Sequence, residues 1–327
     1  MFSKLKKQMS WRHGVQLFFA LIVAYIGIDF IMFVNQITKQ TSAIINRPPG
    51  VEAFLPLSAL VGLRAWLATG RFDPVHPAGL VIFLVILVTS LLFKRTFCSW
   101  ICPIGTLSEG LGKIGRALFG RNFKTPVWLD LILRSLKYVL LLFFLLAIFW
   151  GMSGTDAASF VQSPYNRMSD VMMLEFIEHL SIIGFSVFGV LALLSVLIEN
   201  FWCRYLCPYG ALLGLISFLS PVKITRNQNT CIECGKCTKS CPSRIDVAHE
   251  SRVFSPECTG CLNCVQQCPV KDTLTLKASW GKKTLSIPLL TIAILCLWLL
   301  SIVVAKLTGH WGSDMTVETY KQLLLML

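Results

Sequence analysis

The chain has 327 residues, of which 54% are hydrophobic and only 14% are charged, whereas about 25% of the residues in an ordinary soluble domain are charged. One core of this size cannot bury so much apolar surface, so the composition excludes an ordinary soluble protein and indicates a chain embedded in lipid. The formal net charge of +13 at pH 7 would suit nucleic acid, but the basic residues do not alternate with aromatic ones. We therefore expect no nucleic acid partner.

Five segments are long and apolar enough to be considered as membrane-spanning helices. They cover residues 15–34, 77–93, 128–150, 180–198 and 285–305. The first begins like a signal peptide, but it is too long and no small-residue cleavage site follows it, so we expect an anchor. The third carries Arg134 and Lys137, which we expect to reach the membrane interface from its first turns.

The basic residues are distributed unevenly over the loops between these segments. If the segments alternate in direction, 23 of the 30 Lys and Arg residues fall on one side of the membrane and 7 on the other. Because basic loops stay in the cytoplasm, this distribution predicts a cytoplasmic N-terminus and an external C-terminus. The clustered cysteines would then lie at the cytoplasmic face of a bacterial inner membrane.

The chain has 13 cysteines, and all except Cys296 fall in closely spaced groups, which favours metal ligation by reduced thiols over secreted disulfides. Between residues 226 and 276, two blocks each have the spacing CxxCxxCxxxCP. A zinc ribbon would need only paired CxxC groups, whereas four cysteines in each block match the two-cluster arrangement of bacterial ferredoxins. The cysteines of the two blocks are Cys231, Cys234, Cys237, Cys241, Cys258, Cys261, Cys264 and Cys268.

In that arrangement, three cysteines of one block bind a [4Fe–4S] cluster together with the last cysteine of the other block. The first cluster would be held by Cys231, Cys234, Cys237 and Cys268, and the second by Cys258, Cys261, Cys264 and Cys241. We expect strands at residues 222–225 and 273–277 and a short helix at residues 245–252. The pattern resembles the bacterial two-cluster ferredoxin module, which implies one-electron transfer.

A second cysteine pattern occurs twice, each time directly after an apolar segment. Residues 98–107 and 203–212 share the pattern Cys-x3-Cys-Pro-x-Gly-x-Leu, which indicates a duplication. Cysteines four residues apart share one face of a helical turn, and the proline favours a new helix start, whose N–H groups stabilise a thiolate. The four cysteines of these CxxxCP motifs are Cys98, Cys102, Cys203 and Cys207.

These four thiols leave three interpretations open. If segments 77–93 and 180–198 pack side by side, the thiols could converge on one metal ion or iron–sulfur cluster. Alternatively, each pair could form a redox-active disulfide or bind metal transiently, or the cysteines could be buried packing residues at a helix turn. Cys296, which lies inside the last apolar segment without a partner, is interpreted as a packing residue.

Together, the apolar segments, the CxxxCP motifs and the eight-cysteine blocks resemble the NapH/NosR/CcoG group of membrane polyferredoxins. The resemblance covers residues 48–277 and is most specific at residues 97–107, 201–212 and 231–269. It implies electron transfer through the cytoplasmic membrane, linked to quinol or to the assembly of a respiratory metalloenzyme. The chain lacks the flavin-bearing N-terminal region of NosR-type proteins and the C-terminal extension of CcoG-type proteins, so we expect the short NapH-like or YccM-like form.

A quinone site would need an apolar cleft at the membrane edge with polar groups that exchange protons. On the predicted external side, residues 53–67 are interpreted as an interfacial helix that Pro56 opens. Around this helix we place the candidate quinone-binding residues Glu52, Arg64, Asp73 and His76, with an ordinary role at the interface as the alternative.

We therefore expect an α-helical membrane protein of about five transmembrane helices with a small α+β two-cluster ferredoxin-like module. Residues 1–220 would form a membrane domain, residues 221–284 the cytoplasmic module, and residues 285–327 a last transmembrane helix with an external tail. The predicted function is electron transfer between the quinone pool and a redox partner, as a subunit of a quinol-linked oxidoreductase. Two [4Fe–4S] clusters and a metal or iron–sulfur centre at the CxxxCP cysteines would carry the electrons.

Two other functions stay open. A copper reductase or respiratory-enzyme maturation factor similar to CcoG would bind and reduce metal at the CxxxCP thiols. A redox-sensing scaffold would use residues 221–284, whose net charge is +5, to attract an acidic regulator or anionic lipid. The partners that we expect are membrane lipid, quinone and a periplasmic or cytoplasmic redox protein.

Overall fold

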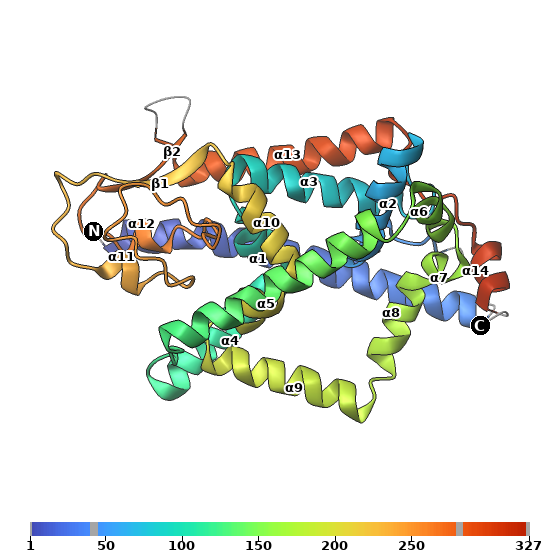
Figure 1. Ribbon diagram of the computed structural model, residues 1–327, viewed down its shortest axis with the longest axis horizontal. Coiled ribbons are helices and arrows are strands. Elements are labelled where there is room, and N and C mark those ends of the chain that lie inside the picture. Colours follow the sequence, from blue (N-terminus) through green and yellow to red (C-terminus); the bar gives the residue numbers. More distant parts are fainter. Residues whose placement is uncertain (1, 40–44, 279–283, 325–327) are drawn as a thin grey trace. The chain divides into compact units, whose positions relative to one another are not determined.

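The computed structural model of this chain describes residues 2–39, 45–278 and 284–324 and is mostly helical (Figure 1). The chain divides into two compact units. The first, here called the cysteine unit, comprises residues 1–20, 86–141 and 188–297, and all 13 cysteines fall in these ranges. The second unit comprises residues 21–85, 142–187 and 298–327.

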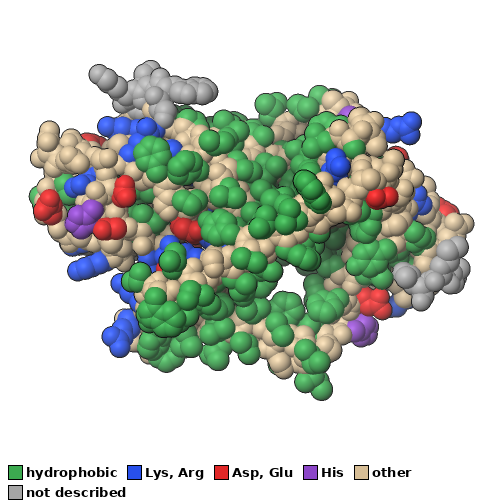
Figure 2. Space-filling view, viewed as in Figure 1, with side chains coloured by type: hydrophobic (Ala, Val, Ile, Leu, Met, Phe, Trp, Pro, Cys, Tyr) green, Lys and Arg blue, Asp and Glu red, His purple; other side chains and the backbone are tan. Residues whose placement is uncertain are grey.

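Three of the described helices are long and apolar enough to cross a membrane. They are α1 (Phe2–Thr38), α5 (Val127–Leu145) with the π-helical turn that extends it (Leu146–Trp150), and α13 (Ile287–Leu307). A bilayer core about 30 Å thick needs about 20 helical residues, a length that all three reach. Large apolar side chains such as Phe143 are exposed on these helices, as contact with lipid requires. Hydrophobic side chains cover much of the face shown in Figure 2.

Two of the five expected spans are shorter or bent. Helix α3 (Pro77–Phe93) covers the expected range but has only 17 residues. Helix α9 (Ile182–Leu197) has 16 residues and is bent by 84° against α8 (Ser169–Glu178), so the pair forms a broken span or a re-entrant turn. Within the described residues there are therefore three membrane-length helices, or four if the bent pair is one span, where the sequence predicted five.

Both CxxxCP motifs have the same local structure in the cysteine unit. Each begins in a π-helical turn, Phe97–Ile101 or Trp202–Leu206, and its proline is the first residue of the next helix. These helices are α4 (Pro103–Phe119) and α10 (Pro208–Phe218). The expected helix start at the proline is confirmed. Proline suits this position, because the first N–H groups of a helix have no partner within the helix and proline has no N–H to leave unpaired.

The ferredoxin region contains a two-stranded antiparallel sheet. Strand β1 (Val222–Arg226) pairs with β2 (Leu274–Ala278) so that Ile224 lies opposite Leu276, and both side chains are buried. The two expected strands are thus confirmed to within one residue. Two four-residue helices, α11 (Lys236–Lys239) and α12 (Asn263–Gln266), follow the cysteine loops.

The expected short helix at residues 245–252 is wrong, because this segment consists of turns and extended chain. Its last residues bond to the edge of β1: Arg226 N–H donates to the Ser251 carbonyl, and Val253 N–H donates to the Ile224 carbonyl. A backbone that pairs with a strand cannot also form helical hydrogen bonds. The apolar pattern of the segment instead buries Val247 and Val253.

The second unit contains the shorter helices α2 (Pro56–Thr69), α6 (Gly154–Val161), α7 (Pro164–Arg167) and α14 (Val317–Leu324), together with a 3-10 helix (Pro49–Phe54) and α8. Helix α2 begins at Pro56, as predicted, and packs against α6 with one face buried. Apolar residues of α1, α8 and α14 form a core in which Phe33 contacts Tyr320 edge to face.

Candidate functional site

The cysteines predicted for the second cluster lie around one cavity of the cysteine unit. Cys241, Cys258, Cys261 and Cys264 all line it, together with apolar side chains that include Ile224. Three of these cysteines, Cys258, Cys261 and Cys264, are buried, and the fourth comes from the other block. The donor set therefore fits a buried [4Fe–4S] cluster, which needs four thiolates in an apolar setting.

The cysteines predicted for the first cluster line a separate cavity. Cys231, Cys234, Cys237 and Cys268 surround it, so the last cysteine of each block again lies with the first three of the other. This donor set also fits a [4Fe–4S] cluster, but it is closer to solvent. Cys234 is exposed, and the neighbouring Ile232 is 63% exposed.

Left-handed backbone at matching positions shapes the two cysteine loops. Glu233 and Gly235 flank Cys234, while Gly260 and Leu262 flank Cys261, and all four residues have φ between 53° and 65°. Such residues turn the chain sharply, so that three cysteines spaced by two residues can face one point. The structure therefore carries the repeat at the level of the backbone as well as in the spacing.

Glycine allows the tight turn in each CxxxCP motif. A Cβ atom added to Gly105 would lie 2.1 Å from the carbonyl oxygen of Cys98, a distance at which the backbone would have to move. At the equivalent Gly210 the added atom would lie 3.5 Å from the Cys203 carbonyl and 2.9 Å from a guanidinium nitrogen of Arg95. The glycine of the pattern is thus explained by close approach of other groups.

The structure brings the four CxxxCP thiols close enough to influence one another. Burial raises the pKa of Cys102 to about 12, with Cys98 and Cys207 adding to the shift. Burial likewise raises the pKa of Cys203, and the other three thiols raise it further. Ionising four gathered, partly buried thiols is costly unless a cationic group offsets their charge, which iron would do when these residues ligate it.

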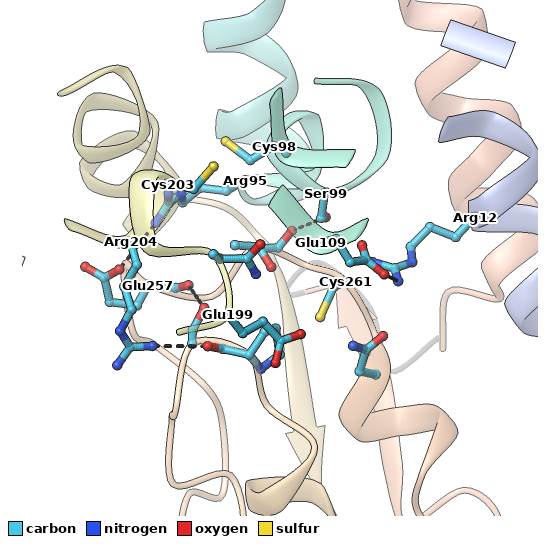
Figure 3. Close-up of a pocket in the computed structure, with 16 residues that line it drawn as sticks. Arg12, Arg95, Cys98, Ser99, Glu109, Glu199, Cys203, Arg204, Glu257 and Cys261 are labelled. Atoms are coloured by element: carbon cyan, nitrogen blue, oxygen red, sulfur yellow. Dashed lines mark hydrogen bonds and ion pairs between the residues drawn. The ribbon is translucent and has the colours of Figure 1, made fainter. Parts of the chain in front are cut away.

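The segment between Cys98 and Cys102 is joined directly to the loop that carries Cys258 and Cys261. Ser99 Oγ donates a hydrogen bond of 2.7 Å to the Thr259 carbonyl, and Trp100 Nε1 donates one of 3.2 Å to the Gly260 carbonyl. Figure 3 shows Ser99 beside this loop and Cys98, Cys203 and Cys261 around one cavity.

The second CxxxCP motif reaches the same cluster site from another side. Arg204, which follows Cys203, donates 3.1 Å to the carbonyl of Pro242, the residue after Cys241. Its guanidinium also forms a buried pair with Asp130 of α5, at distances of 2.8 and 2.9 Å. Each motif therefore contacts one of the two chain segments that carry the second set of cysteines.

A buried carboxylate stands between the membrane helices and this site. Glu257 precedes Cys258 and accepts hydrogen bonds from Lys137 Nζ at 2.6 and 2.8 Å and from Tyr138 at 2.8 Å. The expectation that Lys137 reaches an interface is wrong, since its side chain is fully buried and its charge is compensated by Glu257. Arg134, which is partly exposed, pairs with Asp130.

Three of the four candidate quinone residues lie together in the second unit. Glu52 and His76 are each 1% exposed and Asp73 is 4% exposed, so the alternative as interfacial surface residues is not supported for them. Glu52 lies 3.7 Å from His76 Nδ1, and Asp73 accepts hydrogen bonds from the backbone N–H groups of Val75 and His76. The guanidinium of Arg64, the fourth candidate, lies 6.0 Å from the centre of the Phe149 ring.

Sequence reasoning missed the residues that complete this buried network. Arg47 pairs with both Glu52 and Asp170, and its Nη2 atom lies 3.2 Å from His76 Nδ1. Tyr320 of α14 donates 3.2 Å to Asp170. Burial raises the pKa of Asp73. Burial acts to lower the pKa of His76, but Glu52 holds that pKa above its ordinary value. No spacing rule joins positions so far apart in the chain.

The lone Cys296 lies exposed on α13. It therefore faces outward from the helix and is not enclosed as a packing residue. In the described ranges, no three His, Cys, Asp or Glu side chains are placed to hold a single metal ion.

Two cysteine loops whose thiols line two cavities in interleaved sets, together with several membrane-length helices, are typical of a ferredoxin-type membrane protein. A 4Fe-4S binding domain model matches residues 75–126 and 180–227, which contain both CxxxCP motifs. A 4Fe-4S dicluster domain model matches residues 223–269. The chain belongs to the family of polyferredoxin membrane proteins that includes YccM, NapH, NosR and NirI.

Similarity to individual relatives extends over most of the chain. YccM of Escherichia coli (strain K12), named as a putative electron transport protein, is 42% identical over 96% of this chain and 90% of the relative. The ferredoxin-type protein NapH of the same organism is 26% identical over 81% of this chain and 87% of the relative. The regulatory protein NosR of Pseudomonas aeruginosa is 27% identical over 52% of this chain but only 23% of its own length. No solved structure matches the chain significantly.

Proposed function

We propose that this protein carries electrons between the quinone pool and a redox partner through three iron–sulfur centres. Two would be [4Fe–4S] clusters on the interleaved cysteine sets, and the third would be a [4Fe–4S] cluster on the four CxxxCP thiols. When bound, such clusters supply one-electron transfer, at potentials set by charge, hydrogen bonds and solvent exposure. The match of a 4Fe-4S binding domain model to both CxxxCP segments supports the third centre over a disulfide or a packing role.

The observation that carries the proposal is the attachment of the Cys98–Cys102 segment to the Cys258–Cys261 loop. The hydrogen bonds of Ser99 and Trp100 end on the two residues that separate Cys258 from Cys261. Such contacts hold the thiols of the motif and the second cluster site in fixed proximity. A direct connection of this kind is expected where electrons pass between two sites.

The difference in exposure supports an order for the three centres. The CxxxCP thiols are partly exposed and three cysteines of the second set are buried, whereas the first set includes the exposed Cys234. We propose that electrons pass between the CxxxCP centre, the second cluster and then the first cluster, where a redox protein would dock. The direction of flow depends on the partner.

The proposed setting is the bacterial inner membrane, with lipid around the membrane-length helices. The excess of basic residues in alternate loops supports a cytoplasmic N-terminus, a cytoplasmic cluster region and an external C-terminus. The buried Glu52, Asp73 and His76 support proton exchange with a quinol near the external end of α3, and Arg64 remains a candidate beside the Phe149 ring. Reporter fusions at both termini test the orientation.

Anaerobic reduction of the purified full-length chain tests this function. Wild type should contain about twelve iron atoms per chain, and addition of menaquinol should reduce its clusters, as followed by low-temperature electron paramagnetic resonance. The double variant Cys98→Ser/Cys203→Ser should contain about eight iron atoms and should not be reduced by menaquinol, although dithionite reduces it. Cys296→Ser is the matched control and should behave as wild type.

Two results would contradict the proposal. About eight iron atoms in wild type would mean that the CxxxCP thiols hold no cluster. Menaquinol reduction that is equally fast in wild type and in the double variant would mean that electrons enter elsewhere.

A copper reductase or maturation factor is the second candidate, and one observation favours it. Cys98 and Cys203 line a polar cavity that contains three acidic and three basic side chains, so a metal ion could reach these thiols without repulsion by a net charge of the lining. In this case, cuprous ion should bind stoichiometrically to wild type and to Cys296→Ser, but not to Cys98→Ser, with the iron content of the interleaved sets unchanged. Absence of copper binding by the iron-loaded wild type would exclude it.

A further inference from the structure

Arg95 is a buried cation that lies between the CxxxCP thiols and the second cluster site. It precedes Cys98 by three residues, and its side chain is 3% exposed. Arg95 lines the same cavity as Cys98 and Cys203, and its Nη2 atom lies beside Gly210 of the second motif. Figure 3 shows Arg95 beside Cys98 and Cys203 in the wall of the shared cavity.

The other side of the guanidinium is fixed by the segment that leads into Cys258. Arg95 Nη1 donates 3.2 Å to the carbonyl of Pro256 and lies 3.6 Å from the carboxylate of Glu257. Because Glu257 also binds Lys137, its charge is shared, and the Arg95 charge is only partly neutralised. The arrangement leaves a net positive charge beside the thiols.

The duplication supplies this cation only once. Arg95 corresponds to Asn200 when the two CxxxCP motifs are aligned on their cysteines. The single guanidinium nevertheless reaches the second motif, because Gly210 has no side chain. A Cβ atom added to Gly210 would lie only 2.9 Å from Arg95 Nη2. One arginine of the first motif thus serves both motifs.

We propose that Arg95 is a positioning residue that raises the reduction potential of the CxxxCP centre and couples it to the second cluster. The inference rests on the proposed function, since it requires a redox centre on these four thiols. One electron from the quinol of the proposed function adds one negative charge to that centre, and the quinol releases its protons as it is oxidised. When the electron passes on, the centre is reoxidised and the second cluster is reduced. A guanidinium stays protonated at any ordinary pH and acts strongly at a buried site, so it stabilises the reduced form.

Redox titration of the full-length protein tests the proposal by electron paramagnetic resonance. At the ambient potential at which half of the wild-type centre is reduced, the ratio of reduced to oxidised centre should be at least tenfold lower in Arg95→Gln. This ratio corresponds to a midpoint potential lower by about 59 mV for one electron. Arg95→Lys, which keeps the charge, should recover most of the wild-type potential. Arg116→Gln is the control, because Arg116 is an exposed arginine of α4 that pairs with Glu199, and its loss should leave the midpoint potential as in wild type.

The iron content separates the possible outcomes. If wild type and Arg95→Gln both contain about twelve iron atoms and have the same midpoint potential, the role of Arg95 would be overturned. The proposed function would remain intact. Equal shifts in Arg95→Gln and Arg95→Lys would also overturn it, since they would indicate a packing effect rather than charge. About eight iron atoms in wild type would overturn the proposed function and, with it, this inference.

Discussion

Lys137 Nζ of α5 lies 2.6 Å from a carboxylate oxygen of Glu257, the residue that precedes Cys258. The lysine side chain is fully buried, and 120 residues separate the two partners in the chain. A membrane-length helix is thus tied by a charged hydrogen bond to the loop of the second cluster site. Because both groups are out of water, each depends on the other for compensation of its charge.

Replacement of Lys137 should therefore destabilise the fold around the second cluster site. In Lys137→Met the Glu257 carboxylate keeps Tyr138 and the more distant Arg95 but loses its shortest cationic contact, so we expect a loss of about 3 kcal/mol. The free energy of unfolding in detergent and the retention of iron after mild denaturant measure this loss.

The double variant Lys137→Met/Glu257→Gln is the control for uncompensated charge. It should recover part of the stability, since removing both members of a buried pair costs less than removing one. Equal stability of the single and double variants would contradict the assignment of the effect to the unpaired carboxylate.

Two glycines of α4 should respond oppositely to alanine. Gly105→Ala would place a Cβ atom 2.1 Å from the Cys98 carbonyl oxygen, so the motif must distort, and we expect loss of about four iron atoms per chain. Gly110→Ala meets nothing within 4 Å in the same helix and should gain about 0.5–1 kcal/mol of stability. Iron analysis and thermal unfolding compare the two, and full iron content in Gly105→Ala would refute the close approach.

Substitution of single cysteines should distinguish cluster ligands from the unpaired thiol. Cys234→Ser removes a residue that lines the exposed cavity of the first set and should cost about four iron atoms per chain. Cys296→Ser changes an exposed side chain on α13 and should leave the iron content as in wild type. Iron loss in Cys296→Ser, or none in Cys234→Ser, would contradict the assigned ligand sets.

The stability of the second unit should depend on pH through Asp73. Burial outweighs the two backbone hydrogen bonds that Asp73 accepts and raises its pKa above the ordinary value of 3.8. A group whose pKa is raised in the fold contributes stability that is full below its unfolded pKa and is lost as the pH rises through the folded value. The free energy of unfolding of Asp73→Asn relative to wild type should therefore increase from about pH 4 towards pH 7.

Asp246→Asn is the matched control for this pH dependence. The hydrogen bond from His249 lowers the pKa of the exposed Asp246, so its contribution is present above the unfolded pKa and is lost as the pH falls. Chemical unfolding at several pH values should give slopes of opposite sign for the two variants. A flat or falling difference for Asp73→Asn would show that Asp73 ionises as freely in the fold as in the unfolded chain.

The cysteine spacing was sufficient to predict which cysteines line each of the two cavities, the strands beside them and the helix starts at Pro103 and Pro208. These features are local, since a turn, a cap or a strand of five residues depends mainly on its own sequence. The helix expected at residues 245–252 failed because the segment pairs with β1, and that pairing outweighs an apolar pattern.

Composition and spacing by themselves determined that this chain meets lipid and carries iron–sulfur motifs, because both properties follow from residue types at fixed separations. Only the tertiary structure decided that Arg95 and Glu257 lie between the CxxxCP thiols and the second cluster site, and that Arg47 joins Glu52 to Asp170. These contacts join residues more than a hundred positions apart, or lie where no spacing rule applies. A buried charge needs a partner, but the sequence does not state which one, since the partner is set by how the helices pack.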